Sequence, residues 1–315
     1  FRFRTGVALA LAFAWVPGAI LAGPFERSFT FQSDQLTVSN LIGAVRVEGV
    51  PGDEFKVRVE VQGDDASQDL IQIEERQGSR AELLVRFPTE EYRKYVYPKL
   101  GRGSTTVFDL DRRGRDDDWL RKIVDLATGQ RIQVRGSSWR GGLEVWADVV
   151  IQVPRDREVL VRLGVGSIDA NDLQGDAELR TRSGPVSAEN ITGDLLVDTG
   201  SGGVDLHAVR GEVDVDTGSG SVDAADLRQA RSVKIDTGSG SVRVDGVEAQ
   251  DLAIDTGSGR VKLADVDVKR LVVDTGSGGV GGDGVSADDV AIDTGSGGVD
   301  LELTRMGGGV FHVDT

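Results

Sequence analysis

The sequence predicts an all-β protein whose second half is a single-stranded β-solenoid, or β-helix, with about 19 residues in each coil. Three observations support this prediction: a string that recurs at a nearly constant interval, apolar residues that alternate with polar ones in every copy, and a scarcity of rings. All four Trp, all three Tyr and nine of the ten Phe precede residue 150. A narrow stacked interior favours Val, Ile and Leu over rings, because β-branched residues fit a pleated surface well.

The recurring string is Asp-Thr-Gly-Ser-Gly, which occurs six times at steps of 18, 20, 19, 19 and 19 residues. Two degenerate copies, VRLGVGSI at 161–168 and LRTRSGPV at 179–186, precede the set at 18-residue steps. A unit of this size cannot bury its own apolar face, so successive units must stack around a shared interior. The six copies begin at Asp198, Asp216, Asp236, Asp255, Asp274 and Asp293.

Within each copy, apolar residues stand one and three positions before the aspartate, and a valine stands six positions after it. Alternation with a period of two predicts strands, so we expect two or three short strands in each copy. Gly-Ser-Gly is expected to form a turn that needs a positive φ. The alternation directs each aspartate outward and each threonine inward. The resulting structural columns are Thr199, Thr217, Thr237, Thr256, Thr275 and Thr294, and Val204, Val222, Val242, Val261, Val280 and Val299.

The region before the array, residues 23–150, is also predicted to be rich in strands. Short alternating segments separated by Asn, Gly, Asp and Pro predict strands at 29–31, 36–41, 44–48, 55–61, 70–74 and 82–87. The segment VSNLIGAVRV at 38–47 aligns with VDTGSGGVDL at 197–206. We therefore expect residues 38–47 to form a divergent early coil, or the cap on which the rod nucleates.

A charged insertion at residues 88–142 interrupts the strand pattern. It contains one predicted short helix, with an acidic start at Asp116, an apolar face that includes Ile123, and a stop at Gly129. The stretch YRKYVYPKLGRG at 92–103 interleaves three tyrosines with basic residues. This stretch is either a solvated excursion whose rings pack on the β-domain or a ligand patch for sugars or an anionic polymer. Strands resume at 143–153, and the solenoid domain is assigned to residues 151–315.

The two ends of the sequence carry further signals. Residues 1–22 resemble a signal peptide, since two arginines precede an apolar run from Gly6 to Leu21 that ends in small residues. The alternative is an uncleaved membrane anchor. The first residue is not Met, and Asp314 with Thr315 begins another copy. We therefore expect the given sequence to be truncated at both ends.

Composition excludes several classes of function. The net charge of −16 argues against nucleic acid and against anionic membrane surfaces. The absence of cysteine excludes disulfides, zinc ribbons and thiol nucleophiles, and two histidines, His207 and His312, leave little scope for a histidine cluster. The phosphate-binding G-x-x-x-x-G-K, the G-x-S-x-G elbow and the H-E-x-x-H motif are also missing.

The string Asp-Thr-Gly-Ser is also the nucleophilic signature of aspartic proteases. That chemistry needs two aspartates on separate loops that converge to share a proton. Here the six aspartates occupy one position of a translational repeat, so no unique pair meets across a cleft. We favour a structural role, in which each aspartate accepts backbone N–H bonds of the turn that follows it.

Calcium is the alternative explanation for the acidic residues. Residues 151–315 carry 30 acidic and 15 basic side chains, a net charge of −15. One segment, GGVGGDGVS at 278–286, fits the calcium-binding nonapeptide G-G-x-G-x-D-x-U-x once. Ca²⁺ takes six to eight oxygen ligands, and one carboxylate per coil is sparse. The possible ligands are the six repeat aspartates and Asp283; no other cofactor is predicted.

The signal-like start, the strand-rich region and the Asp-Thr-Gly-Ser-Gly-x-Val-x-Val copies together resemble the bacterial putative-adhesin family, which consists of β-strand-repeat domains of unknown function. The resemblance covers residues 29–87 and 143–315. It implies a single-chain β-solenoid of the cell envelope and surface adhesion, and it supplies no catalytic residues. The insertion at 88–142 departs from the repeat pattern.

These observations predict an exported, non-enzymatic protein of the periplasm, cell surface or medium that acts as an adhesin or scaffold. The expected partner is a surface protein or a glycan; nucleic acid is not expected, and membrane contact is expected only through an uncleaved signal. Two alternatives are a polysaccharide-active enzyme on a β-helix and an envelope-stress regulatory binding module. Turnover of a glycan would favour the first of these over a scaffold.

Overall fold

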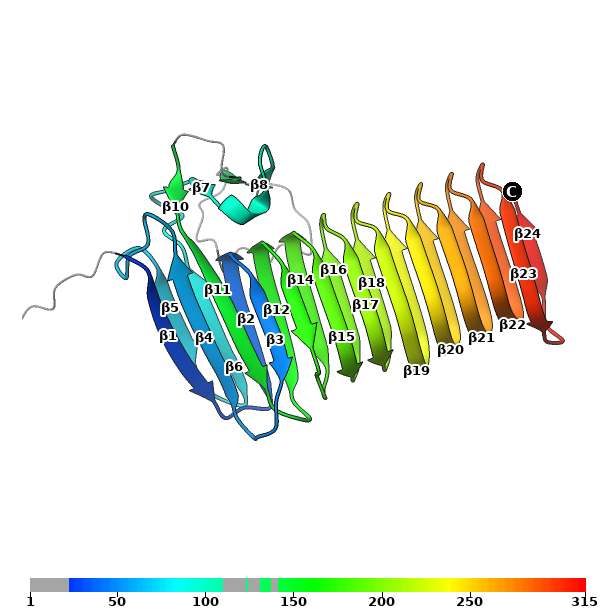
Figure 1. The fold of residues 1–315 in the computed structure, drawn as a ribbon, viewed down its shortest axis with the longest axis horizontal. Coiled ribbons are helices and arrows are strands. Elements are labelled where there is room, and N and C mark those ends of the chain that lie inside the picture. The colour runs from blue at the N-terminus through cyan, green and yellow to red at the C-terminus, as the bar shows by residue number, and fades with distance from the viewer. Residues whose placement is uncertain (1–22, 110–122, 124–130, 137–140) are drawn as a thin grey trace, which may run out of the picture.

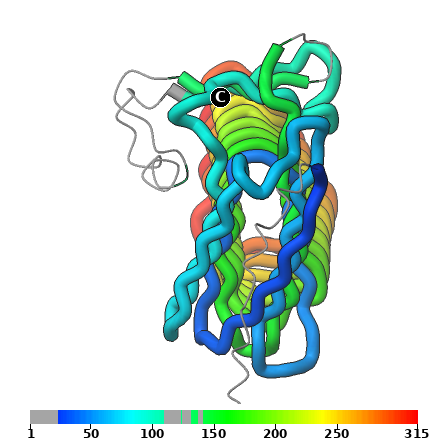
Figure 2. Tube along the Cα trace, turned by 90° about the vertical axis from the view of Figure 1, so that its left-hand side faces the viewer, coloured from blue at the N-terminus to red at the C-terminus, as the bar shows by residue number. Residues whose placement is uncertain are grey.

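The structure is a computed structural model that describes residues 23–109, 123, 131–136 and 141–315. Its strands lie side by side along a rod, with the first strands at one end and the last coil at the other (Figure 1). Viewed along the rod, the coils of the array lie one behind another with two long sides (Figure 2). This arrangement confirms an all-β solenoid with coils of about 19 residues.

Strands account for nearly all of the regular structure in the described part of the chain. The strands before the array are β1 (Phe25–Phe31), β2 (Gln35–Ile42), β3 (Val45–Gly49), β4 (Phe55–Gln62), β5 (Gln72–Arg76), β6 (Arg80–Arg86), β7 (Lys94–Val96), β8 (Thr105–Asp109), β9 (Arg131–Arg135), β10 (Leu143–Glu144) and β11 (Trp146–Val153). A short 3-10 helix, η1 (Pro98–Leu100), lies between β7 and β8.

The array continues from β12 to β24. Its strands are β12 (Glu158–Val165), β13 (Ile168–Asn171), β14 (Ala177–Ser183), β15 (Val186–Thr192), β16 (Leu195–Thr199), β17 (Val204–Arg210), β18 (Val213–Thr217), β19 (Val222–Thr237), β20 (Val242–Thr256), β21 (Val261–Thr275), β22 (Val280–Thr294), β23 (Val299–Met306) and β24 (Phe311–Asp314).

Each coil of the array contributes one strand to each of two parallel ladders. One ladder contains β12, β14, β16, β18 and the later segments of β19–β22 (233–237, 252–256, 271–275 and 290–294). We call its outer surface the aspartate face. The other ladder contains β13, β15, β17 and the first segments of β19–β22, beginning at 222, 242, 261 and 280. We call its outer surface the opposite face.

Equivalent residues of successive coils are in register. Val204 pairs with Val222, which pairs with Val242, and this column continues through Val261 and Val280. Between residues 222 and 294 the two segments of a coil join into one bent strand of 15 or 16 residues. The stacking predicted from the repeat is therefore confirmed, although the later coils contain one long strand rather than two or three short ones.

The expectation of a positive φ in the Gly-Ser-Gly turns is wrong. None of the glycines in the six Asp-Thr-Gly-Ser-Gly strings has a left-handed backbone. These glycines are needed for space instead. A Cβ added to Gly240 would lie 1.7 Å from the carbonyl oxygen of Gly220 in the preceding coil, and a Cβ on Gly259 would lie equally close to that of Gly240. Only glycine permits so close an approach of two backbones.

In the coils that carry the string, the residues with a positive φ lie at the other corner, where the chain passes from the opposite face to the aspartate face. Ala208 has φ 55°, Gln229 has φ 58° and Asp265 has φ 49°. Two later coils use glycine there, Gly246 at φ 68° and Gly284 at φ 70°. In these coils the residues that adopt a positive φ therefore lie at a corner that the sequence motif does not mark.

The early segment 35–49 is a true coil of the same solenoid. Strand β2 pairs in parallel with β12, and β3 pairs in parallel with β13. Val38 pairs with Val161, which pairs with Leu179 and then Val197. The predicted alignment of residues 38–47 with 197–206 is therefore confirmed by the strand register.

Antiparallel strands cover the N-terminal end of the rod. β4 lies between β1 and β11 and is antiparallel to both, while β5 is antiparallel to β6. β11 follows the insertion in sequence and pairs in parallel with β3. One hydrophobic cluster extends from Phe31 to Ile292, so this end and the array share a continuous interior.

Three strands of the insertion form a small separate sheet with β10, which directly follows the insertion, in the order β10-β7-β9-β8. The insertion contacts the rod through an ion pair between Lys99 and Asp148 at 2.8 Å and a hydrogen bond between the Thr106 and Ser183 hydroxyls at 3.1 Å. The helix predicted from Asp116 to Gly129 lies outside the described residues, except for Ile123, which is buried.

Candidate functional site

The six repeat aspartates form one column on the aspartate face. Each aspartate is the register partner of the aspartate in the next coil. All six side chains are partly or fully exposed. Neighbouring strands are about 4.8 Å apart, so the column sets carboxylates at that spacing along the rod. The column continues at Asp314 and, in the other direction, at Arg180 and Arg162.

The threonine that follows each aspartate is buried and fixes the turn. The Thr237 hydroxyl donates to the Gly220 carbonyl of the preceding coil at 3.0 Å, and it accepts the Gly240 N–H of its own turn at 3.0 Å. Thr256 and Thr275 repeat both bonds. In these coils the threonine, rather than the aspartate, accepts the N–H of the second turn glycine. The aspartate side chain points away from the interior.

The threonine and valine columns line the interior from opposite sides. All six threonines are at most 1% exposed, and the valines from Val204 to Val280 are at most 2% exposed. Val299, in β23, is only partly buried. Because both columns are fixed in the interior, the outward side chains of each coil are held at a constant register.

The carboxylates of the column influence one another. Burial, followed by the charges of Asp236 and Asp274, raises the pKa of Asp255, while Lys234 acts in the opposite direction. Repulsion between unit charges at this spacing is about 1 kcal/mol in water. The aspartate face therefore favours contact with positive charge.

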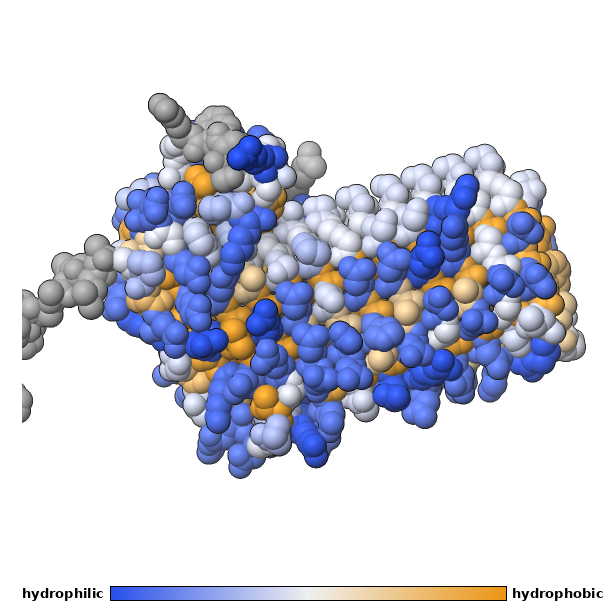
Figure 3. All heavy atoms as spheres, in the orientation of Figure 1, coloured by the Kyte–Doolittle hydropathy of each residue, from blue (hydrophilic) through white to orange (hydrophobic). Residues whose placement is uncertain are grey.

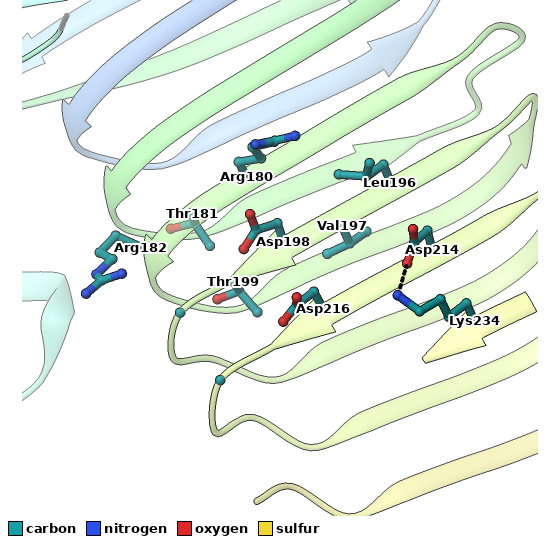
Figure 4. A pocket seen from close by; sticks show the side chains of 12 residues that line it. Arg180, Thr181, Arg182, Leu196, Val197, Asp198, Thr199, Asp214, Asp216 and Lys234 are labelled. Carbon is teal, nitrogen blue, oxygen red and sulfur yellow. Dashed lines mark ion pairs between the residues drawn. The ribbon is translucent and has the colours of Figure 1, made fainter. Parts of the chain in front are cut away.

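A shallow groove of about 340 Å³ lies where the column changes from arginine to aspartate. Figure 4 shows Arg180, Asp198 and Asp216 on three successive strands, with the ion pair between Asp214 and Lys234, whose atoms are 3.8 Å apart, on the neighbouring column. Hydrophilic side chains lie in rows along the rod with apolar residues between them (Figure 3). Such a surface offers many charged contacts along the rod.

The two arginines that precede the aspartates in this column were missed in the interpretation of the sequence. Arg162 and Arg180 occupy the aspartate position of the two degenerate copies. The signal was present in VRLGVGSI and LRTRSGPV, because aligning them on the repeat places these arginines directly in the column.

The structure does not gather the possible calcium ligands into one site. Asp283 lies in the first segment of β22, opposite Ala264, on the opposite face rather than in the aspartate column. Among the residues described, no group of three His, Cys, Asp or Glu side chains has an arrangement that would hold a metal ion. The carboxylates of the column follow one another along a line, one per coil.

The arrangement also differs from an aspartic protease. Two catalytic aspartates must approach within hydrogen-bond distance to share a proton. The aspartates here are successive members of a ladder, one strand apart, and no unique pair faces across a cleft. The column is suited to binding through many equivalent charges.

The three tyrosines of the insertion have different environments. Tyr95 is 1% exposed and packs edge-on against Phe87, with ring centroids 5.9 Å apart. Tyr97 is 3% exposed, with its ring 6.0 Å from that of Trp146. Burial raises the pKa of both hydroxyls well above the ordinary range. Only Tyr92 is exposed, so packing on the β-domain explains two of the three rings.

Comparison with known proteins gives one family match. The family model described as Toastrack DUF4097 matches residues 147–314, more than half of the chain. No curated protein is significantly similar to the sequence. No helix among the described residues has the length and hydropathy to cross a bilayer.

Similar solved structures include three bacterial proteins. A putative adhesin from Bacteroides fragilis is 11% identical with a TM-score of 0.41, over 89% of this chain and 96% of that one. A putative adhesin from Parabacteroides merdae is 10% identical with a TM-score of 0.41, over 93% and 96% of the two chains. A putative cell adhesion protein from Clostridium sporogenes is 12% identical with a TM-score of 0.26, over 89% and 100%.

Proposed function

This chain belongs to the Toastrack DUF4097 family, and we propose that it is an exported, non-enzymatic interaction scaffold of the cell envelope. Its aspartate face binds a positively charged partner at the cell surface, in the manner of an adhesin. The observation that carries this proposal is the in-register column of six outward aspartates.

A rigid column has an advantage over the same charges on a mobile chain. The threonine and valine columns hold every aspartate in place before a partner arrives, so little ordering cost remains to be met on binding. Charges of one sign on one surface also increase the rate of encounter with a partner of opposite sign. The column from Asp198 to Asp293 carries one sign only, whereas on the opposite face Arg243 forms an ion pair with its register partner Asp223 at 3.5 Å.

The experiment compares two triple variants of equal charge. The test variant replaces Asp236, Asp255 and Asp274 by Asn on the aspartate face. The control variant replaces the exposed Asp205, Asp245 and Asp283 by Asn on the opposite face. Binding of a decalysine probe is measured by surface plasmon resonance at low and at physiological salt.

We expect the test variant to weaken binding by about tenfold or more at low salt, equivalent to about 1.4 kcal/mol, and the control variant to weaken it by less than about threefold. Equal losses in the two variants would contradict a specific role for the aspartate face. Native chain that binds no probe at either salt concentration would contradict it as well.

Localisation and catalysis have their own tests. Protease added to intact cells should cleave a surface-displayed chain, whereas a periplasmic chain should be cleaved only after the outer layer is opened. Cells that lack the chain should adhere less well than cells that carry it. Release of reducing ends from any member of a glycan panel would contradict a non-enzymatic scaffold.

A further inference from the structure

Tyr92 is the one tyrosine of the insertion that the fold does not use for packing. Its side chain is 39% exposed, whereas Tyr95 and Tyr97 are at most 3% exposed and each faces another ring. An exposed ring that stabilises no core needs another explanation, because tyrosine combines a large apolar surface with a polar hydroxyl and is favoured in binding sites.

The backbone holds Tyr92 in place from both sides. The Tyr92 N–H donates to the Pro88 carbonyl at 2.9 Å and closes a turn in which Thr89 is buried at 2% exposure. The next residue is tied to β9, because the Gln133 N–H donates to the Arg93 carbonyl at 2.8 Å. The ring is therefore presented on an ordered turn.

A hollow of about 680 Å³ opens beside this ring, within the usual size range of small-molecule sites. Its described lining comes from three segments of the chain. Asp65 lies before β5, Gly142 and Leu143 lie at β10, and the remaining lining is the turn itself and the start of β7. The charged lining residues are Asp65, Glu90, Glu91, Arg93 and Lys94.

Most of these charged groups have no partner within the described part of the chain. Asp65 accepts the Glu144 N–H at 2.8 Å, which fixes its carboxylate. The side chains of Glu90, Glu91, Arg93 and Lys94 are exposed and form no hydrogen bond or ion pair with other described residues. Elsewhere on the insertion, Lys99 is paired with Asp148. The hollow therefore offers both acceptors and donors to a ligand.

The chemistry of this hollow points to a carbohydrate. The C–H face of a pyranose ring packs on an aromatic ring, and its hydroxyl groups both donate to carboxylates and accept from guanidinium and ammonium groups. A purely apolar ligand would leave the charged groups of Glu90, Glu91, Arg93 and Lys94 without a partner. Three carboxylates against two cations disfavour an acidic sugar.

We propose that the Tyr92 hollow binds a neutral or amino sugar residue of an oligosaccharide, with the pyranose stacked on the Tyr92 ring. Glu90 and Glu91 accept hydrogen bonds from sugar hydroxyl or amino groups, and Arg93 and Lys94 donate to ring and hydroxyl oxygens. This site is separate from the aspartate face and belongs to the end of the rod that carries the insertion (Figure 1).

The test is titration of the full chain with neutral, amino and acidic oligosaccharides by isothermal calorimetry and saturation-transfer NMR. Tyr92→Phe keeps the ring and loses only the hydroxyl, so binding should fall by less than about threefold. Tyr92→Ala removes the ring and should weaken binding by about tenfold or more, since aromatic contacts contribute about 1 kcal/mol or more. Thermal unfolding is recorded for each variant.

A charge-matched pair tests the polar contacts. Arg93→Ala should weaken sugar binding, whereas Arg243→Ala, at an exposed arginine of the rod, should not. The proposal is overturned if no neutral or amino oligosaccharide binds at millimolar concentration, or if Tyr92→Ala binds as well as the native chain. The triple Asn variant of the aspartate face should retain sugar binding, so failure of this site and failure of the proposed function are distinguishable.

Discussion

The N-terminal end of the rod and the repeat array fill their interiors in different ways. At the N-terminal end, Phe31 and Phe55 are fully buried, and antiparallel strands cover the first coil. In the array, valine, leucine, isoleucine, alanine and threonine fill the interior, and every strand pair is parallel.

The difference shows what repetition requires of a sequence. Where neighbouring strands differ in sequence, as at the N-terminal end, bulky aromatic rings can fill irregular spaces, and each pair of strands sets its own register. Where each coil lies on a copy of itself, one backbone approaches the next so closely that certain positions admit only glycine. The strictness of the motif therefore reflects contact between coils, while the outward positions are free to carry charge.

The largest expected effect comes from breaking that close contact. A Cβ on Gly202 would lie 1.9 Å from the Gly184 carbonyl oxygen of the preceding coil, so we expect Gly202→Ala to destabilise the chain by more than about 3 kcal/mol. The matched control is its neighbour Gly203, where the nearest atom would be 3.7 Å away, and Gly203→Ala should cost less than about 0.5 kcal/mol. Urea unfolding measures both; equal losses would contradict the account.

A smaller effect is expected from the valine column. Val242→Ala removes two buried methyl groups and should destabilise the chain by about 2–3 kcal/mol. Val299, in the last full coil, is only partly buried, so Val299→Ala should cost less than about 1 kcal/mol. Thermal unfolding followed by circular dichroism would distinguish the two, and a larger loss at Val299 would refute the burial pattern.

The threonine column should give the next effect. Thr237→Val keeps the shape of the side chain but removes the hydroxyl. The buried Gly240 N–H then loses its acceptor, and the Gly220 carbonyl loses the hydrogen bond that the hydroxyl donates. We expect a loss of about 1–2 kcal/mol. Thr237→Ser keeps both bonds and loses one methyl group, so it should cost about 0.8 kcal/mol or less. The pair is compared by chemical denaturation; a Val variant as stable as the native chain would exclude the proposed role of the hydroxyl.

The smallest effect concerns the outward column. The pKa of Asp255 is raised from 3.8 by burial and by Asp236 and Asp274, so ionisation of this residue opposes folding. Asp255→Asn should therefore stabilise the chain at neutral pH, by less than about 0.5 kcal/mol because the carboxylate is exposed and screened. The advantage should shrink as the pH falls through the raised pKa and vanish below 3.8.

Melting temperatures of the native chain and the Asn variant between pH 3 and pH 8 measure this dependence. A difference that grows as the pH falls would have the wrong sign. A second series at high salt should show a smaller difference at neutral pH, because salt screens exposed charges.

The solenoid could be predicted from the sequence because its repeat is short and its alternation is regular. The spacing of the six aspartates gave the coil length, and the alignment of Val38 with Val197 predicted the early coil that the strand register confirms. The path of the chain around the two corners of each coil was harder to predict from the sequence. A glycine needed for space and a glycine needed for positive φ look the same in a sequence, and the left-handed Ala208 and Gln229 carry no sequence signal.

The proposed binding surfaces could be predicted only in part from the sequence. Alternation indicated that the aspartates face outward, and the structure adds that Arg162 and Arg180 occupy the same column. The tyrosine-rich stretch 92–103 was recognised as a ligand patch or a packed excursion. Which tyrosine is exposed depends on contacts with Phe87 and Trp146, which lie outside that stretch, so tertiary structure was needed to single out Tyr92.

The central claim is that outward residues of successive coils are aligned along the rod, and paired cysteines test it most directly. The chain has no cysteine of its own, and Asp216 is the register partner of Asp236. Asp216→Cys with Asp236→Cys places two outward side chains one strand apart, about 4.8 Å, a Cα separation that a disulfide spans. Asp216→Cys with Asp255→Cys separates the thiols by two strands. Under mild oxidation the first pair should form an intramolecular disulfide, detected by mass spectrometry, and the second should remain reduced; efficient bridging of the second pair, or none of the first, would contradict the aligned column.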